Sequence, residues 1–449
     1  MNLSNKIDPR ISDIPDEYYI NDFRKLSDFK KITYSGYQKS DVLSALQKSI
    51  LDQKLEESCH WSGEMLISGH LMECWDRLIL INSKLINYSN PNLPFYLWSR
   101  FVQAIQIVQG EKYLGEKVLN LRNNQECRNH LTDIVTLMTL SPKNKLKTLP
   151  KITTEDFRID YFEEKLEAKH IYLLEKIIKH NDPSEINVVM NEFAFQITNR
   201  TGNLEKALYW LNWILEWEKL NIKKAEGFNC ATRVRKYIKP QYHHDIVWMI
   251  WDVIFQEATV RNNDFLNKQL IGLFKLFKYN FTSPGKRKKS PLIVHAINLL
   301  AYEDKIKWEA QITNQTKLFI QANANTNLLY LEFIKKAKNN NNYQKKDDGL
   351  QVLIRDNYLI SDQKIQTSQK PTSSSNSNSK KEKNMVANTD LQKMNMLNML
   401  DKKMMNNTPN PNNINQRYNP NPFQMIANSN SKQYQNTEDV LQQIQSIIQ

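Results

Sequence analysis

The amino-acid sequence predicts an all-α fold, a multi-helix array of helical hairpins built as an α-solenoid or a bundle, with a disordered C-terminal tail. Apolar residues recur every three or four positions between residues 40 and 336, the period of an amphipathic helix. The chain has only 10 glycines, which favours helices over the many tight turns of a β fold. Residues 336–449 are rich in Asn, Ser and Lys, so they bury too little surface to offset chain entropy.

These patterns divide the chain into five segments. We expect an extended N-terminal arm at 1–34, a helical domain at 35–140 and a second helical domain at 150–338 that contains a basic region at 221–290. A disordered linker rich in Asn, Ser, Lys and Met follows at 339–435, and an amphipathic helix closes the chain at 436–449.

The first two predicted helices form a hairpin. Ser40 or Asp41 is available to cap the first helix, and a polar turn at 52–54 ends it. The second helix carries Trp61 beside its apolar face and stops at Gly69, since only glycine readily adopts the left-handed backbone. The apolar positions of the hairpin are Val42, Leu43, Leu46, Ile50, Leu55, Cys59 and Met65.

Further helices are predicted at 71–86 and 98–108, as a pair within 184–217 on either side of a Thr201-Gly202 turn, and at 243–259, 262–279, 291–301 and 315–336. The segment NLEKALYW (203–210) aligns with KLEESCHW (54–61), which indicates either a duplicated hairpin or chance similarity between common helical residues. Residues 351–360 are compatible with a strand or a transient helix.

The charge of the chain is +13, and residues 221–290 contain 14 Lys or Arg against 5 Asp or Glu. Such a region attracts polyanions, so one interpretation is electrostatic, sequence-independent contact with DNA or RNA. The alternatives are a solvated surface or, for the KRKK run, a nuclear import signal. The candidate contact residues are Arg233, Arg235, Lys236, Lys239, Lys286, Arg287, Lys288 and Lys289.

The sequence favours a soluble, intracellular protein. Its first residues lack the apolar core of a secretion signal, and no later segment has the roughly 18 apolar residues that span a bilayer. The four cysteines include no CxxC pair, which indicates reduced thiols rather than disulfides or a ribbon-type zinc site.

Three constellations invite a chemical interpretation. His243, His244 and Asp245 resemble part of a metal-binding HD site but have no distant partners, so a helix cap by Asp245 is the preferred interpretation. The two remaining groups are a zinc set of Cys59, His60, His70 and Cys74, and a base-stacking platform of Trp210, Trp213 and Trp217. Packed thiols and a helical core stripe explain them better, so we predict no catalytic, metal or cofactor site.

The C-terminal segment has a Thr437 cap, acidic residues in its first turn and an apolar stripe. It is interpreted as a tethered helix that docks on a partner protein, or as a helix that folds back on its own body. Its candidate anchors are Val440, Leu441, Ile444, Ile447 and Ile448, and a Met-rich run at 391–405 is a second such element.

Residues 36–110, through DVLSALQKSILDQKLEESCHWSGEMLISGH and INSKLINYSNPNLPFYLW, resemble the C-terminal helical collar of the RarA/MgsA group of clamp-loader-type AAA+ proteins. The resemblance implies assembly into homo-oligomers through a hairpin carrying Trp61, close to DNA. The phosphate-binding loop GxxxxGK[ST] is missing, and SPGKRKKS (283–290) is expected to be a basic loop, so ATP hydrolysis is not implied. The whole chain also resembles Asn-rich proteins of large nucleocytoplasmic DNA viruses.

The expected function is therefore a non-enzymatic helical scaffold or adaptor in DNA replication or transcription. Its partners would be other proteins and, through the basic region, DNA or RNA, without a membrane. The expected location is the host cytoplasm, in a viral factory, or the nucleus. The alternatives are a virion component that packages the genome and a metal-dependent phosphohydrolase.

Overall fold

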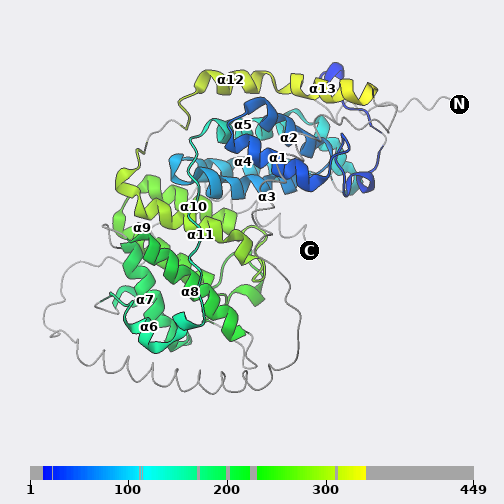
Figure 1. Cartoon of the computed structure of the whole chain (residues 1–449). Helices are drawn as coiled ribbons and strands as arrows, with labels where there is room; N and C mark the ends of the chain where they lie inside the picture. The colour runs from blue at the N-terminus through cyan, green and yellow to red at the C-terminus, as the bar shows by residue number, and fades with distance from the viewer. Residues whose placement is uncertain are drawn as a thin grey trace, which may run out of the picture. The chain divides into compact units, whose positions relative to one another are not determined.

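The computed structural model describes residues 14–339, except 23, 111–112, 114, 169–171, 199–202, 223–229 and 309–311. Its regular elements are helices (Figure 1), and the only β pairing among the described residues is an isolated antiparallel bridge between Ile32 and Gln38. The predicted all-α fold is confirmed. No described helix is long and apolar enough to cross a membrane. The linker, the Met-rich run and the docking helix with Val440, Leu441, Ile444, Ile447 and Ile448 lie outside the described residues.

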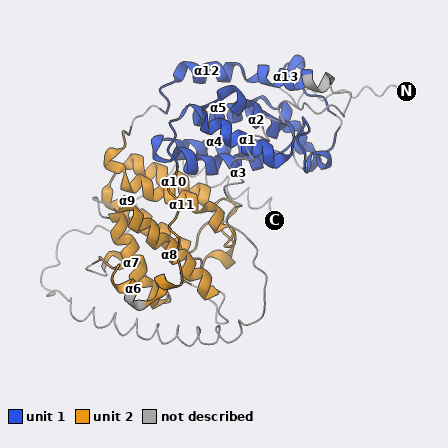
Figure 2. Ribbon diagram, in the orientation of Figure 1, with its two compact units in different colours: residues 1–145, 308–372, 437–449 blue, residues 146–307, 373–436 orange. Residues whose placement is uncertain are grey.

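The helices divide into two compact units (Figure 2). The helices of unit 1 are α1 (Lys39–Leu51), α2 (Leu55–Ile67), α3 (Leu71–Ile81), α4 (Leu93–Val108), α5 (Gln125–Leu140), α12 (Thr316–Ala324) and α13 (Thr326–Asn339). Those of unit 2 are α6 (Ile159–Glu163), α7 (Ser184–Thr198), α8 (Leu204–Ile222), α9 (Val247–Arg261), α10 (Asp264–Lys278) and α11 (Lys286–Ala301).

The predicted first hairpin is present as α1 and α2. Trp61 is only 5% exposed and meets Tyr37 edge-on at 5.5 Å between ring centroids. Gly69 ends α2 with φ +79°, as the stop signal predicted. The predicted cap is wrong, because Ser40 and Asp41 lie inside α1, and Gln38 precedes the helix without a side-chain cap.

Helix α5 is the helix that the periodicity analysis missed. It begins after Asn124, whose side chain accepts a hydrogen bond from the backbone N–H of Cys127 at 2.7 Å. It packs against α1, α2, α4 and α12 and so forms the centre of unit 1. Four buried residues of its stripe, Leu131, Ile134, Val135 and Met138, could have revealed it from the sequence.

The C-terminal described segment differs from prediction in two ways. The helix expected at 315–336 is broken at Asn325 into α12 and α13. Both helices belong to unit 1, whereas we expected them in the second domain. The reason is their packing on unit 1, where the ring of Tyr330 lies 3.9 Å from the guanidinium carbon of the buried Arg128 of α5.

Unit 2 has an aromatic core. Trp210 and Trp213 of α8 are buried, and Phe162 of α6 packs edge-on against Trp210 at 5.6 Å. The indole N–H of Trp213 donates to the backbone carbonyl of Asp156 at 2.9 Å. The tryptophans at 210 and 213 are therefore core residues, as the interpretation of a buried helical stripe predicted.

Candidate functional site

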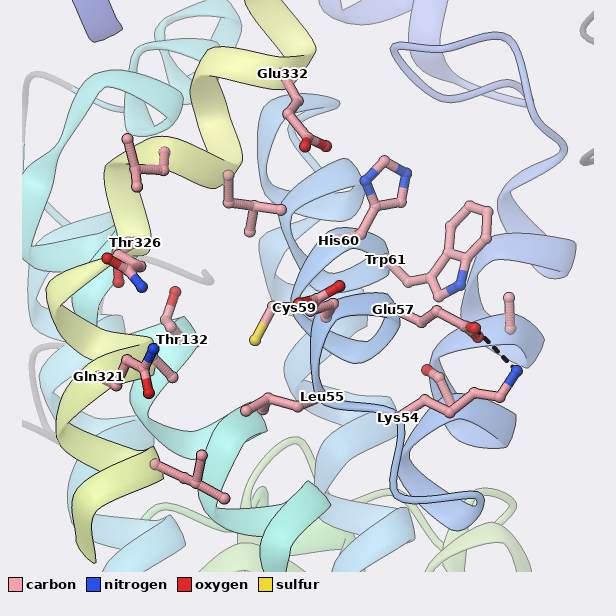
Figure 3. Close-up of a pocket in the computed structure, with 18 of the residues that line it drawn as sticks. Lys54, Leu55, Glu57, Cys59, His60, Trp61, Thr132, Gln321, Thr326 and Glu332 are labelled. Atoms are coloured by element: carbon pink, nitrogen blue, oxygen red, sulfur yellow. Dashed lines mark hydrogen bonds and ion pairs between the residues drawn. The ribbon is translucent and has the colours of Figure 1, made fainter.

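A groove of about 780 Å³ lies in unit 1 between the α1–α2 hairpin and the pair of helices α12 and α13 (Figure 3). Helix α2 supplies Leu55, Cys59 and Trp61, and Thr132 comes from α5. The opposite side, formed by α12 and α13, includes Gln321, Thr326 and Glu332. The volume falls in the range that proteins use for ligands, about 300–1,000 Å³.

Close packing holds α13 against α2 beside the groove. The ring of Phe333 stacks on His60 with 4.8 Å between centroids. A Cβ built on Gly63 would approach the Phe333 ring to 3.0 Å, so glycine permits this close contact. The contact of Phe333 with α2 therefore forms one boundary of the groove.

The thiol of Cys59, which lines the groove, is expected to be unreactive. Burial raises the pKa of the Cys59 thiol to about 11, and its sulfur lies 3.7 Å from the hydroxyl of Thr136. A thiol is a weak nucleophile, because the thiolate is the reactive form. The site is consequently better suited to binding than to covalent chemistry.

The rim of the groove is acidic. Four carboxylates line it, Asp52, Glu56, Glu57 and Glu332, against two lysines. Lys54 pairs with Glu57 at 2.9 Å. Asp52, Glu56 and Glu332 are exposed and make no ion pair with another described residue. An excess of negative charge on one surface of a chain with net charge +13 favours a basic ligand.

Apolar side chains lie between these charges. Leu318 of α12 is 45% exposed and Leu328 of α13 is 51% exposed, and both line the groove together with Leu55 and Leu329. Ile320 of α12 is 61% exposed but does not line the groove. An open apolar strip with a charged rim is the usual character of a groove that accepts an amphipathic helix.

The predicted basic region lies in unit 2, and the structure places several of its cations in the interior. Arg233 is 2% exposed and forms two hydrogen bonds to Asp182, at 2.8 and 2.7 Å. Burial acts to raise the pKa of Asp182, but the hydrogen bonds from Arg233 hold it below its usual range. Arg235 pairs with Asp252 at 2.5 Å. These two arginines form ion pairs within unit 2, and their side chains are too little exposed to contact a polyanion.

The KRKK run is the first turn of α11, not the basic loop that we expected. Cations are unfavourable at a helix N-terminus, because the exposed amides there carry partial positive charge. Lys286 is compensated by two buried carboxylates, since its ammonium pairs with Glu218 and lies 2.9 Å from Asp245. Burial and the charge of Asp245 raise the pKa of Glu218, against the opposing effect of Lys286.

The other predicted contact residues fall into two groups. Arg287 is half-buried and pairs with Glu216 at 2.9 Å, and the ammonium of Lys289 donates to the carbonyls of Phe277 and Tyr279. Exposed side chains remain at Lys236, Lys239 and Lys288. Only these three of the eight predicted contact residues have exposed side chains.

The histidines that were considered as metal ligands instead contact backbone carbonyls. A ring nitrogen of His243 lies 3.0 Å from the carbonyl of Ile238, and one of His244 lies 3.0 Å from that of Cys230. Asp245 accepts from the N–H of Val247 at 3.1 Å, but the N-cap position of α9 is occupied by Ile246, without a side-chain cap, and not by Asp245 as predicted. His70 lies 2.6 Å from the carbonyl of Phe29. Among the described residues, no three His, Cys, Asp or Glu side chains are grouped so as to hold a metal ion.

Sequence reasoning missed the groove, because one of its two sides comes from α12 and α13, which lie far from α2 along the chain. The sequence held no usable signal, because the exposure of Leu318 and Leu328 appears only in the structure. Comparisons with models of protein families, with curated proteins and with solved structures found no match.

Proposed function

We propose that the protein is a non-enzymatic helical adaptor that binds an amphipathic, basic helix in the groove of unit 1. The observation that carries the proposal is the groove itself, which is lined both by the exposed Leu318 and Leu328 and by the carboxylates of Glu56 and Glu332, which pair with no other described residue. Leucines would take the apolar side of the incoming helix, and the carboxylates would attract its lysines or arginines.

The cellular setting rests on the resemblance of residues 36–110 to the clamp-loader collar. It favours an adaptor in DNA replication or transcription, acting as a homo-oligomer or with other proteins. A structural component of a virion is the alternative. Contact with DNA or RNA would come from Lys236, Lys239 and Lys288, whose side chains are exposed.

The test uses three synthetic 15-residue peptides with one common apolar stripe and net charges of about +3, 0 and −3. Fluorescence anisotropy with the full chain should show the basic peptide binding most tightly. Leu318→Asp with Leu328→Asp should abolish this binding, because charges would replace the apolar contacts. Ile320→Asp is the matched control, since it changes an exposed leucine-sized residue of α12 outside the groove.

Two results would contradict the proposal. Equal affinity for the three peptides would show that the carboxylates of the rim do not contribute to binding. An equal loss with Ile320→Asp would show that the peptide binds to α12 without using the groove.

A further inference from the structure

The groove and the C-terminal part of the same chain have complementary chemistry. Residues 391–405 read LQKMNMLNMLDKKMM, in which Met394, Leu397, Leu400 and Met404 recur at helical spacing. The segment carries three lysines and one aspartate, so it is basic, whereas the groove has four carboxylates and two lysines. Apolar side chains and charge thus both match the ligand that the groove favours.

Methionine suits this role. Its unbranched side chain fills irregular spaces, and proteins use it on surfaces that must adapt to a partner. The groove is lined by leucines, alanines, Trp61 and a thiol, an uneven apolar surface of this kind. A helix of 15 residues is roughly 22 Å long, and the residues that line the α12–α13 side likewise extend over 15 positions, from Leu318 to Glu332.

The rest of the tail offers a poorer match. Residues 437–449 contain Glu438 and Asp439 and no lysine or arginine. Their charge has the same sign as the rim of the groove, so docking there would bring like charges together. The charge of the rim therefore favours binding of 391–405 over binding of 437–449.

The connection is long enough. Residues 340–390 separate α13 from the Met-rich run, and a random coil of 51 residues would span roughly 40 Å on average. Because both partners belong to one chain, the effective concentration of the segment at the groove is on the order of millimolar. Even a weak contact would be populated.

We propose, on the basis of the function proposed above, that residues 391–405 occupy the groove of their own chain and compete with the external helix. Lys402 and Lys403 face the carboxylates of the rim, and the stripe of Met394, Leu397, Leu400 and Met404 covers the exposed leucines. The segment is then an autoinhibitor of the adaptor, displaced by a partner that binds more tightly.

Site-specific photo-crosslinking in the full chain tests the occupant. A benzophenone amino acid in place of Leu328 should crosslink within one chain to peptides from residues 391–405. The same probe in place of Ile320 is the control, since that side chain is exposed beside the groove but does not line it. Crosslinks to 437–449, between chains, or spread evenly over 340–449 would overturn the proposal.

Charge reversal tests the chemistry of recognition. Glu56→Lys with Glu332→Lys should lower the yield at Leu328 about fivefold, as expected for two exposed charge pairs. Lys402→Glu with Lys403→Glu should lower it similarly, and the four changes together should restore it. Glu56 and Glu332 are exposed, so their replacement should leave the melting temperature of the body unchanged. A combination that fails to restore crosslinking would exclude pairing between these groups.

A peptide titration separates the two proposals. The basic peptide should bind the Lys402→Glu, Lys403→Glu chain more tightly than the natural chain, because the competitor has been weakened. Equal affinity for both chains would disprove self-occupation and leave the adaptor function standing. Failure of the peptide to bind either chain, while crosslinks to 391–405 persist, would disprove the external ligand alone.

Discussion

Two buried cations, Arg128 of unit 1 and Lys286 of unit 2, have different kinds of partner. In unit 1, the fully buried Arg128 has carbonyl and ring partners: it donates to the carbonyls of Arg122 at 2.7 Å and of Tyr18 at 3.1 Å, and faces the ring of Tyr330. In unit 2, Lys286 is buried between the carboxylates of Glu218 and Asp245. Burial lowers the pKa of Arg128 to about 10, so it still carries its charge at neutral pH.

The chemistry of the two side chains explains the difference. A guanidinium spreads its charge over a plane with five N–H donors, so carbonyl dipoles and an aromatic face can satisfy it. An ammonium is compact and strongly hydrated, and it needs carboxylates to offset the loss of water. Each cation ties distant segments together, Arg128 across α5 and α13 and Lys286 across α8 and α11.

The largest effect is expected when the ion cluster of unit 2 is broken. Lys286→Met should destabilise the protein by about 3–5 kcal/mol, because two carboxylates would stay buried without a cation. Urea unfolding measures the change. Lys288→Met is the control in the same turn, where an exposed side chain should matter by less than about 0.5 kcal/mol. Similar losses for both variants would mean that Lys286 is not a buried ion-pair partner.

The second-largest loss of stability is expected for Trp61 and Trp210, the tryptophans that align between 54–61 and 203–210. Trp61→Ala in α2 and Trp210→Ala in α8 should each cost about 3 kcal/mol, since both side chains are buried. Thermal and urea unfolding would report the two losses. An unchanged melting temperature for Trp61→Ala would place that side chain in solvent and undermine the hairpin, while unequal losses would argue against equivalent hairpins.

Removing the charge of Arg128 in unit 1 should cost less than removing that of Lys286 in unit 2. Arg128→Met should destabilise by about 1–3 kcal/mol, the range for carbonyls left without donors, because no buried carboxylate loses its partner. Hydrogen exchange should increase mainly in α13, where Tyr330 lies on Arg128. A loss as large as that of Lys286→Met would show that the carboxylates are not what distinguishes the two sites.

A smaller, pH-dependent effect is expected at Asp156 of unit 2. Burial acts to raise its pKa, but hydrogen bonds from Lys165, Thr153 and Tyr209 lower it to about 2. A lowered carboxyl pKa adds stability above its ordinary value near 4, and this is lost as pH falls toward 2. Asp156→Asn should flatten the stability profile between pH 4 and pH 2. The exposed Asp264→Asn is the control, and equal slopes for both variants would rule out this contribution.

The smallest effect on stability should come from the exposed lysines of the basic region. Lys236→Gln, Lys239→Gln and Lys288→Gln together should leave the urea midpoint almost unchanged. If the protein binds DNA or RNA, the slope of log affinity against log salt should decrease in magnitude by up to about 0.9 per lost contact. An unaltered slope would show that the nucleic acid contacts other residues.

Periodicity predicted most of the helices because each one carries its own apolar stripe. The hairpin of α1 and α2 and the stop at Gly69 follow from neighbouring residues alone. The break at Asn325 and the helical KRKK turn did not follow, because both depend on contacts with other segments. Lys286 begins a helix only where Glu218 and Asp245, 68 and 41 residues away, neutralise it.

The groove shows the same limit. Composition indicated a basic chain, and the acidic rim became visible only when α2 and α13 were brought together. Charge count likewise could not separate the buried Arg233 and Lys286 from the exposed Lys236, Lys239 and Lys288. A residue type fixes what a side chain can pair with, but its partner must be supplied by the fold.

The sequence by itself determined the all-α class, the placement of most helices and the burial of Trp61, because spacing, glycine stops and apolar stripes act over a few residues. The tertiary structure alone decided which cations are internal, that α12 and α13 pack on unit 1, and that a groove opens beside α2. Those outcomes depend on residues far apart in the chain, 41 and 68 positions for the partners of Lys286 and more than 200 for Arg128 and Tyr330. Their contacts arise from packing and desolvation and leave no local pattern in the chain.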